Sequence, residues 1–450
     1  MNRLSLFLSS AAVLSAAALL AVATKPGPLT PKHPAAASSH SGALTIDGKL
    51  SHSVVHMDGS ELYAEYTVRL DDETTPTADQ PISMALVLDR SGSMSGAKLE
   101  DARRAAHRFV ELLDGRDELA FITFSDQVES TELLKMTDAN KVTVHGAIDA
   151  VTASGATYLS GGIERGTSAL AMARGARRMV VVSDGQPTVG AVDEPALVSL
   201  VGRAHDGSIT VTALGVGAEY DGLLMQHLAE RGGGMYGYLR DATALEDVLG
   251  KEVAAARSAR VRNVELVLES RDLQVVEVPG RHVRNTVDGA VLHLADLRPG
   301  APTRVLVRLQ SRRSAPESEL GLKATLRWRP LEGESQSSAI TVSTRTVDDT
   351  DLVVTRREES LWAKGVSAAG SMRMVAAAAA WERGDYAGAS NLLDNAKSLF
   401  GMSADALAGQ SEVDTMRRDF GNASGSERKE LSRKLEKKKL LNFGRENEGY

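Results

Sequence analysis

The sequence contains no cysteine. Disulfide bonds, thiol nucleophiles and thiolate metal sites are therefore excluded throughout its 450 residues. Aromatic residues make up only 4% of the chain, and alanine-rich helices account for part of this low value. Positive charge is in deficit, because 52 lysine and arginine residues face 59 aspartate and glutamate residues, for a formal net charge of -7. A nucleic-acid binder needs a basic face to displace counterions, so this composition argues against nucleic acid as a partner.

The motifs of common enzyme classes are missing as well. No His-Glu-x-x-His sequence, Walker loop or GxGxxG sequence after a strand is present. The stretch Gly92–Gly96 has the two glycines of a nucleophile elbow, but its central residue is Met94 rather than serine. Nothing in the sequence places a base beside a nucleophile. We therefore expect that the chain is not an enzyme.

The N-terminal segment, residues 1–23, has the pattern of a secretory signal peptide. Arg3 precedes an apolar stretch that ends in the small-residue sequence Ala21-Val22-Ala23, a cleavage pattern of the A-x-A type. An uncleaved membrane anchor is the alternative, since roughly 20 apolar residues could span a bilayer. Either way we expect export, to the periplasm, the cell envelope or the medium. Membrane contact is expected only if the segment stays uncleaved.

Residues 24–42 are expected to be a linker, because four prolines and a Ser/His/Gly tail do not favour regular structure. Residues 43–80 then contain short strand-like runs. The clearest is Glu61–Leu70, in which apolar and polar residues alternate as in a strand with one buried face. These few strands cannot form a domain alone.

Residues 81–256 carry the strongest pattern, in which apolar strands alternate with helices. The run Ile82–Leu88 is apolar without alternation, which is typical of a strand buried on both faces. Such alternation predicts a doubly wound, mostly parallel six-stranded α/β sheet with helices on both faces. In the strand order 3-2-1-4-5-6, the switch point lies between the strands that end at Asp89 and Val182. Ligands bind at the carboxyl ends of strands at such a point.

Oxygen-bearing side chains gather at this expected crevice. Asp89, Ser91 and Ser93 follow the first strand, Thr157 lies in a glycine-containing loop, and Asp184 follows a later strand. Two carboxylates and three hydroxyls make a hard, all-oxygen donor set, which suits Mg²⁺, Mn²⁺ or Ca²⁺ rather than zinc or copper. Magnesium fits best, because it takes few protein carboxylates and keeps several waters.

The order DxSxS, then Thr in a GAT loop, then SDG after a strand resembles the metal-ion-dependent adhesion site of von Willebrand factor type A domains. Asp89, Ser91, Ser93, Thr157 and Asp184 match that pattern. The chain is identified as a bacterial secreted protein of this kind, and its α/β part is similar to inter-alpha-trypsin inhibitor heavy chains. The resemblance implies that the three hydroxyls donate to the cation and that the two aspartates orient or bind it through water. It also implies that the carboxylate of an exposed Asp or Glu on a protein partner completes the shell.

The rest of the chain divides into two regions. Residues 257–350 show alternating strands separated by turns, which predicts a β-sandwich. The strands of residues 43–80 are the natural partners of these, so the α/β domain would be inserted in a split sandwich. Residues 351–450 are expected to be a helical C-terminal region. Its run GDYAGASNLLDNA resembles half of a tetratricopeptide repeat, but without a second copy we expect a plain helical hairpin.

These features favour a divalent-cation-dependent protein-binding module for adhesion or scaffolding in the envelope or outside the cell. Two alternatives stay open. One is a metal-assisted hydrolase that uses cation-bound water, for which Asp184 is the one candidate base. The other is a structural envelope component in which the cation only stabilises the fold.

Overall fold

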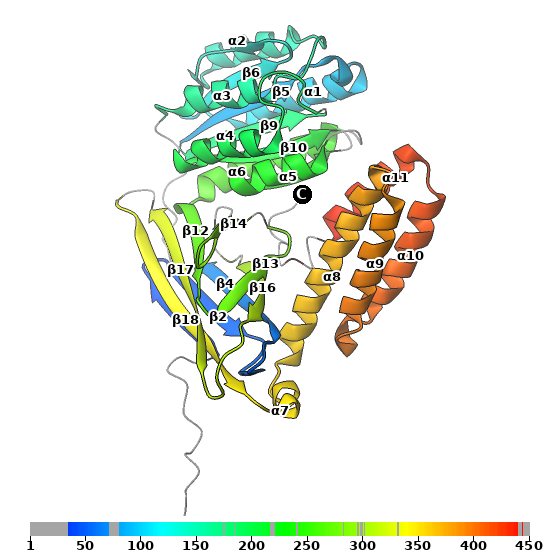
Figure 1. The fold of residues 1–450 in the computed structure, drawn as a ribbon. Coiled ribbons are helices and arrows are strands. Elements are labelled where there is room, and N and C mark those ends of the chain that lie inside the picture. The colour runs from blue at the N-terminus through cyan, green and yellow to red at the C-terminus, as the bar shows by residue number, and fades with distance from the viewer. Residues whose placement is uncertain are drawn as a thin grey trace, which may run out of the picture.

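The computed structural model describes residues 35–71, 81–173, 176–184, 186–216, 221–239, 242–281, 283–294, 297, 300, 302–330, 333–439 and 443. The expected signal peptide, residues 1–23, and the first part of the expected linker lie outside these residues. Three parts are visible in Figure 1: an α/β domain, a β-sandwich beside it, and a group of helices.

The α/β domain contains a mostly parallel sheet with the predicted strand order. Along the sheet the order is β11-β10-β9-β5-β6-β7, and β8 also pairs with β6. The strands are β5 (Ile82–Asp89), β6 (Glu118–Phe124), β7 (Val128–Ser130), β8 (Leu134–Lys135), β9 (Ala176–Ser183), β10 (Ile209–Val216) and β11 (Gly233–Leu239). The short edge strands β7 and β8 are antiparallel to β6, and the other pairings are parallel. The doubly wound α/β fold predicted from the sequence is confirmed, but the described sheet has seven strands rather than the predicted six, because two short strands, β7 and β8, pair with β6.

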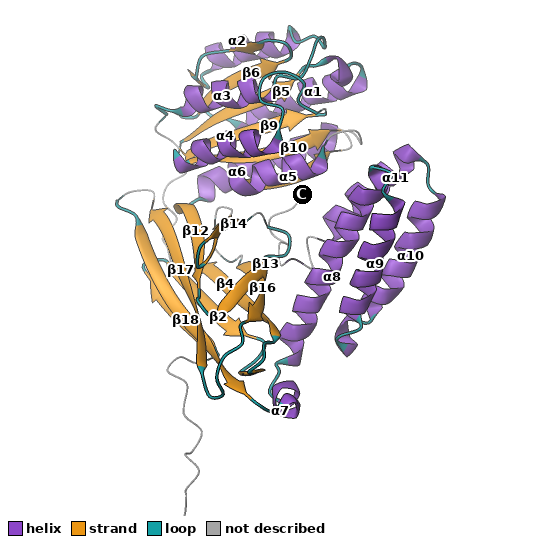
Figure 2. Ribbon diagram, viewed as in Figure 1, coloured by secondary structure: helices purple, strands orange, loops and turns teal. Residues whose placement is uncertain are grey.

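Helices cover both faces of this sheet (Figure 2). The helices α1 (Ala97–Leu112), α2 (Asp138–Asp149) and α6 (Ala242–Ser258) share one apolar core with Met84, Leu86 and Leu88 of β5. The helices α3 (Leu159–Leu170), α4 (Glu194–Asp206) and α5 (Gly222–Arg231) share the opposite core with Ala85 and Val87. Every residue of β5 is buried, which explains why its sequence is apolar without alternation.

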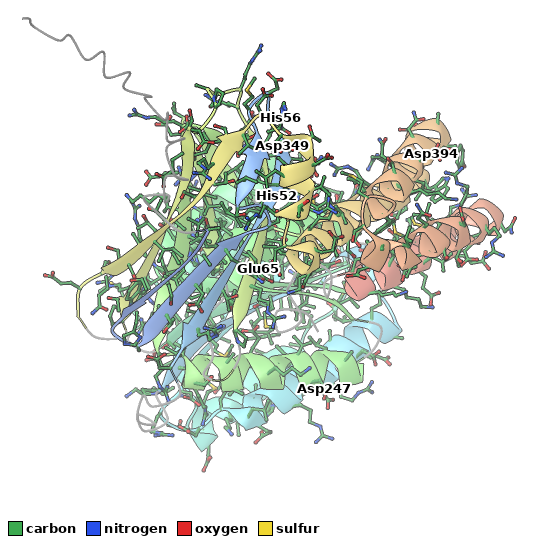
Figure 3. The ribbon with its side chains drawn as sticks, turned by 90° about the horizontal axis from the view of Figure 1, so that it is seen from below. His52, His56, Glu65, Asp247, Asp349 and Asp394 are labelled. Carbon is green, nitrogen blue, oxygen red and sulfur yellow. The ribbon has the colours of Figure 1, made fainter. Side chains whose placement is uncertain are left out.

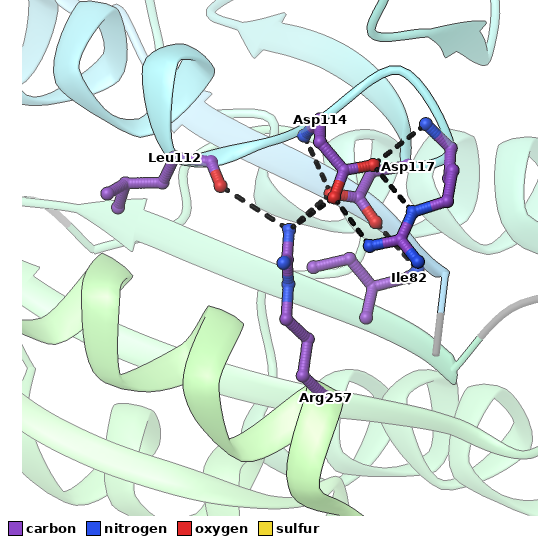
Figure 4. Close-up of polar contacts among 6 residues, drawn as sticks. Ile82, Leu112, Asp114, Asp117 and Arg257 are labelled. Atoms are coloured by element: carbon purple, nitrogen blue, oxygen red, sulfur yellow. Dashed lines mark hydrogen bonds and ion pairs between the residues drawn. The ribbon is translucent and has the colours of Figure 1, made fainter. Parts of the chain in front are cut away.

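A buried carboxylate fixes the amino end of this sheet to the last helix of the domain (Figure 4). Asp117, which precedes β6, accepts hydrogen bonds from the backbone N–H groups of Ile82 (3.1 Å) and Asp114 (2.9 Å). The Arg257 guanidinium of α6 donates to the same carboxylate at 2.6 Å. The start of β5, the turn before β6 and the end of α6 are thereby joined at one point.

The β-sandwich combines strands from both sides of the α/β domain. One sheet has the order β1-β2-β4-β16-β13 and the other β14-β15-β12-β17-β18-β3. Its early strands are β1 (Ala36–Ser41), β2 (Leu44–Leu50), β3 (Val54–His56) and β4 (Glu61–Leu70). Its later strands are β12 (Val261–Glu269), β13 (Leu273–Glu277), β14 (Arg284–Thr286), β15 (Gly289–Leu294), β16 (Thr303–Ser311), β17 (Glu319–Pro330) and β18 (Gln336–Val347). The antiparallel pairing of β4 with β16 is the partnership expected from the alternating pattern, and it makes the α/β domain an insertion.

The expected linker ends earlier than Gly42. Ala36–Ser41 forms strand β1, which pairs antiparallel with β2, and Gly42 makes the turn between them at φ +61°. The prediction of a linker up to Gly42 was wrong because the prolines that disfavour regular structure end at Pro34. The small polar residues that follow accept an edge-strand position once a neighbouring strand supplies backbone hydrogen bonds.

The C-terminal region is helical and packs on the sandwich. It contains α7 (Thr350–Thr355), α8 (Glu359–Glu382), α9 (Tyr386–Phe400), α10 (Ala408–Asn422) and α11 (Gly425–Lys439). Figure 3 labels Glu65 and His52, two sandwich residues that contact α8. Lys364 donates to the Glu65 carboxylate at 3.4 Å, and the His52 ring packs edge-on against Trp362 with centroids 5.3 Å apart. Within the described part of the chain, no helix has both the length and the apolar character needed to cross a bilayer.

Candidate metal centre

The five residues singled out from the sequence lie at the carboxyl end of the parallel sheet. Strands β5 and β9 are neighbours, with Leu88 opposite Val182. Asp89 therefore ends one strand beside the point where Asp184 follows the other. Both aspartates are fully buried, at 0% and 1% exposure.

Four of these residues form one chain of hydrogen bonds. The Asp89 carboxylate accepts from the Ser91 backbone N–H at 2.7 Å. The Ser91 and Ser93 hydroxyls are 3.0 Å apart, and Ser93 Oγ donates to Asp184 Oδ1 at 2.7 Å. Ser183, the last residue of β9, donates its hydroxyl to the other Asp89 oxygen. The oxygens of two separate strands are thus held as one cluster.

Thr157 is tied to this cluster through the backbone. The Gly92 N–H donates to the Gly155 carbonyl at 3.1 Å, which joins the DxSxS loop to the loop that carries Thr157. The Thr157 N–H donates to the Thr188 hydroxyl at 2.9 Å, and its carbonyl accepts from the Thr188 N–H at 3.0 Å. Thr157 is only 5% exposed. The loop hydroxyl is therefore held in place by contacts made by its own main chain.

Glycine is required at position 155 of that loop. Gly155 has φ +78°, and a Cβ there would lie 2.0 Å from an Asp126 carboxylate oxygen. The same carboxylate accepts from the Ala156 N–H at 2.9 Å. The Asp126 carboxylate therefore holds the loop by a hydrogen bond to its backbone. Any side chain at position 155 would displace that carboxylate.

Lys98 is a member of the site that sequence reasoning missed. Its ammonium group, in the first turn of α1, contacts the Asp184 carboxylate and donates to the Ser93 carbonyl at 3.3 Å. The sequence did carry a signal, because a lysine just inside the helix that follows the DxSxS loop is placed to reach back over that loop. Ser183, Thr188 and Asp126 were likewise not recognised as supporting residues.

The two aspartates of the site have different partners: Asp184 pairs with a cationic side chain, whereas Asp89 accepts hydrogen bonds from serines. Burial raises the pKa of Asp89, and the nearby Asp184 charge acts in the same direction. Hydrogen bonds from Ser183 and Ser91 oppose this rise by stabilising the carboxylate. Asp184 is neutralised by the Lys98 ammonium. A bound cation would relieve the burial cost of Asp89 in the same manner.

The donor set fits a hard divalent cation. Its atoms are hydroxyl and carboxylate oxygens, which are the ligands of Mg²⁺, Mn²⁺ and Ca²⁺. Within the described residues no group of three or more histidine or carboxylate side chains converges on a point where it could hold a metal ion. The Asp184 carboxylate already contacts a cationic group, the Lys98 ammonium, through Oδ2, while Oδ1 accepts from Ser93.

The fold is an α/β domain whose loops at the carboxyl ends of β5 and β9 carry the candidate metal residues. Residues 83–251 match the family model of the von Willebrand factor type A domain. The chain is 25% identical to the uncharacterised Escherichia coli protein YfbK over 201 aligned residues. This alignment covers 43% of this chain and 35% of YfbK. It is 29% identical to human inter-alpha-trypsin inhibitor heavy chain H3 over 159 aligned residues. That alignment covers 33% of this chain and 18% of the heavy chain. The chain thus spans about a third or less of the length of these relatives.

Two solved structures share the fold over most of the chain. A von Willebrand factor type A protein from Catenulispora acidiphila has a TM-score of 0.65 and 16% identity, and covers 85% of this chain and 92% of its own. The ArnB paralog VWA2 from Sulfolobus acidocaldarius has a TM-score of 0.58 and 15% identity, and covers 88% and 98%. At these identities the likeness concerns the fold.

Proposed function

We propose that the von Willebrand factor type A domain binds a protein partner through a divalent cation, with Mg²⁺ as the preferred ion and Mn²⁺ or Ca²⁺ as alternatives. Ser91, Ser93 and Thr157 would supply hydroxyl oxygens, and Asp89 and Asp184 would bind the cation directly or through water. The observation that carries this proposal is the hydrogen-bonded series Asp89, Ser91, Ser93 and Asp184, in which Ser93 is the member exposed to solvent.

The donor set explains why the partner should present a carboxylate. Two aspartates at most offset the charge of the cation, and the remaining ligands are neutral hydroxyls. A cation held in this way still gains from a further anionic oxygen. An exposed Asp or Glu side chain on the partner meets that need, and membrane lipid or nucleic acid is not required.

Export belongs to the same proposal. Residues 1–23 have a signal-peptide pattern, and a binding module of this kind would act in the periplasm, in the envelope or outside the cell. Mass spectrometry of the exported form should find a mature protein that begins near Thr24. An intact N-terminus in a membrane fraction would instead indicate an anchor.

Calorimetric titration with Mg²⁺ tests the site, and a pull-down from an envelope fraction with and without EDTA tests the partner. Asp184→Asn should abolish cation binding while retaining an acceptor for the Ser93 hydroxyl. Asp101→Asn is the matched control, because Asp101 lies on α1 and pairs with Arg104. Thr157→Ala should weaken partner binding more than stability. Metal and partner must tighten one another by the same factor, because binding linkage is reciprocal.

Asp89→Ala is a poorer test of cation binding than Asp184→Asn, although repulsion between the two aspartates would suggest that it stays folded. Relief of repulsion between two aspartates would leave Asp89→Ala folded. The structure shows instead that its carboxylate accepts from the Ser91 N–H and the Ser183 hydroxyl in a fully buried position. Removal of such an acceptor costs about 1–3 kcal/mol for each orphaned donor.

The same experiments separate the alternatives. Partner binding that is undiminished in EDTA would refute the metal bridge and support a purely structural cation. Cation-dependent turnover of an envelope substrate, lost in Asp184→Asn, would support the hydrolase.

A further inference from the structure

A second cluster of metal-binding side chains lies on the outer surface of the α/β domain, between α1 and α2. His107 of α1 and His145 of α2 line a cavity of about 400 Å³ at this helix pair. His107 lies about 15 Å along α1 from Ala97, the first residue of the helix. The cluster is therefore separate from the candidate metal centre, which lies before that first residue.

The two imidazole rings face each other through the same nitrogen. His107 Nδ1 and His145 Nδ1 are 2.7 Å apart, and the ring planes differ by 26° with centroids 4.9 Å apart, so the rings meet edge to edge through these nitrogens. Each outer nitrogen is held by a carboxylate. His107 Nε2 is 3.0 Å from Asp149 Oδ1, and His145 Nε2 is 2.7 Å from Glu111 Oε1. The hydrogen-bonded order is therefore Asp149, His107, His145 and Glu111.

The hydrogen-bond partners determine where the protons lie. A carboxylate only accepts, so each Nε2 must carry a hydrogen. One further hydrogen must lie between the two Nδ1 atoms, because two bare lone pairs at 2.7 Å would repel each other. The pair therefore shares one proton at a position where both lone pairs converge. The His145 hydrogen bond lowers the pKa of Glu111, which keeps that outer partner ionised.

We propose that His107 and His145 form a transition-metal site, in which an ion such as Zn²⁺ replaces the shared proton and binds both Nδ1 atoms. Imidazole nitrogen is a preferred ligand of Zn²⁺, Ni²⁺ and Cu²⁺. A metal-binding histidine commonly donates its other N–H to a carboxylate, which fixes the ring and raises its basicity. Asp149 and Glu111 are already in that position.

The geometry requires a small adjustment. Zn–N bonds of about 2.0–2.1 Å at a tetrahedral angle place two nitrogens about 3.3 Å apart. The rings must therefore separate by roughly 0.6 Å from the hydrogen-bonded distance, which rotation of partly exposed side chains allows. Water would fill the other coordination positions, in keeping with the absence of a third convergent histidine or carboxylate among the described residues.

The arginines around the cavity do not oppose a cation, because each faces a carboxylate. The pairs are Arg103 with Asp149, Arg104 with Asp101, and Arg108 with Glu246. Lys141 likewise pairs with Glu111 at 3.4 Å. The local charge is therefore close to balanced before a metal ion binds.

Calorimetric titration of the untagged full chain with ZnCl₂ tests the proposal, in buffer that contains excess Mg²⁺. Wild type should bind one Zn²⁺ per chain at this site, and His107→Gln or His145→Gln should each weaken that event at least tenfold. Asp149→Asn and Glu111→Gln should weaken it about tenfold by loosening the rings. His227→Gln is the matched control and should bind as wild type does, because His227 pairs with Glu194 on α4.

A spectroscopic measurement identifies the ligands directly. One equivalent of Cu²⁺ should show electron paramagnetic resonance coupling to two imidazole nitrogens in wild type and to one in either histidine variant. Zn²⁺ should also raise the apparent Tm of wild type and not that of the variants, because an ion that binds only the folded chain stabilises it. Equal Zn²⁺ affinity in wild type and both histidine variants would overturn the proposal. Since Asp184→Asn leaves these histidines untouched, failure of the Mg²⁺ site and failure of this site are independent results.

Discussion

Lys98 is expected to lower the affinity of the candidate metal centre for a cation. Its ammonium group forms an ion pair with the Asp184 carboxylate, and a metal ion at this site would compete for the same carboxylate. Lys98→Met should therefore have two opposite effects. It should tighten Mg²⁺ binding, because no ammonium has to leave, and it should destabilise the metal-free protein, because Asp184 loses its counter-charge.

The magnitude follows from simple electrostatics. Two unit charges 4 Å apart interact by about 4 kcal/mol at an effective dielectric constant of 20, so an ammonium and a divalent cation would repel by roughly 8 kcal/mol. Lys98 must therefore move away when the metal binds. Its side chain is 31% exposed, and solvent screening reduces the value of its pairing with Asp184 to roughly 0.5–1 kcal/mol. At 1.4 kcal/mol per factor of ten, Mg²⁺ should bind about 2- to 5-fold more tightly in the variant.

Calorimetric titration with MgCl₂ at low ionic strength measures the affinity, and thermal unfolding with and without Mg²⁺ measures the stability. Lys135→Met is the matched control, because Lys135 is an exposed lysine on β8 of the same domain. It should leave Mg²⁺ affinity unchanged. Weaker or unchanged binding in Lys98→Met would show that the ammonium does not compete with a cation, and the account of Asp184 given above would be wrong.

Two further predictions concern stability. Asp117→Ala leaves the Ile82 N–H and the Arg257 guanidinium without their buried acceptor, and should destabilise the α/β domain by roughly 3–5 kcal/mol, measured by hydrogen exchange of β5 amides. The pKa of His52 is lowered to about 4 by burial and by the Arg357 charge. His52 is thus neutral in the folded chain and gains a proton on unfolding below pH 6.5, so stability falls as the pH falls from 6.5 toward 4. Between pH 7 and 4.5, wild type should lose roughly 2–3 kcal/mol more than His52→Gln, followed by tryptophan fluorescence, and equal losses would contradict this assignment.

The sequence predicted the α/β part well because its signals are local. An apolar run such as Met84–Leu88 has no polar face, which favours a strand covered on both sides, and every residue of β5 is buried. Alternation of strands and helices then restricts the topology, and the carboxyl ends of β5 and β9 meet at the switch point. Asp89 and Asp184 could be assigned to one crevice on that basis.

Other features depend on contacts that sequence spacing does not show. Strand β1 exists because β2 lies beside it, and its own composition favours a linker. The reach of Lys98 to Asp184 depends on the orientation of the first turn of α1 over the loop. The pair of His107 with His145 depends on the packing of α1 against α2, across 38 positions of sequence. Each is a tertiary contact between segments whose local patterns are unremarkable.

The two ends of β5 allow metal binding and folding to be tested separately. The chain enters the α/β domain just before Ile82 and leaves it through α6 into β12, both near the Asp117 contact. The oxygen cluster begins at Asp89, about 23 Å away along the strand. Asp117→Ala should therefore lower stability while the folded fraction binds Mg²⁺ with wild-type affinity, whereas Lys98→Met should change both. If Asp117→Ala also changed Mg²⁺ affinity, the sheet would transmit strain along its whole length, and the cation site could not be treated as a local feature of the loops.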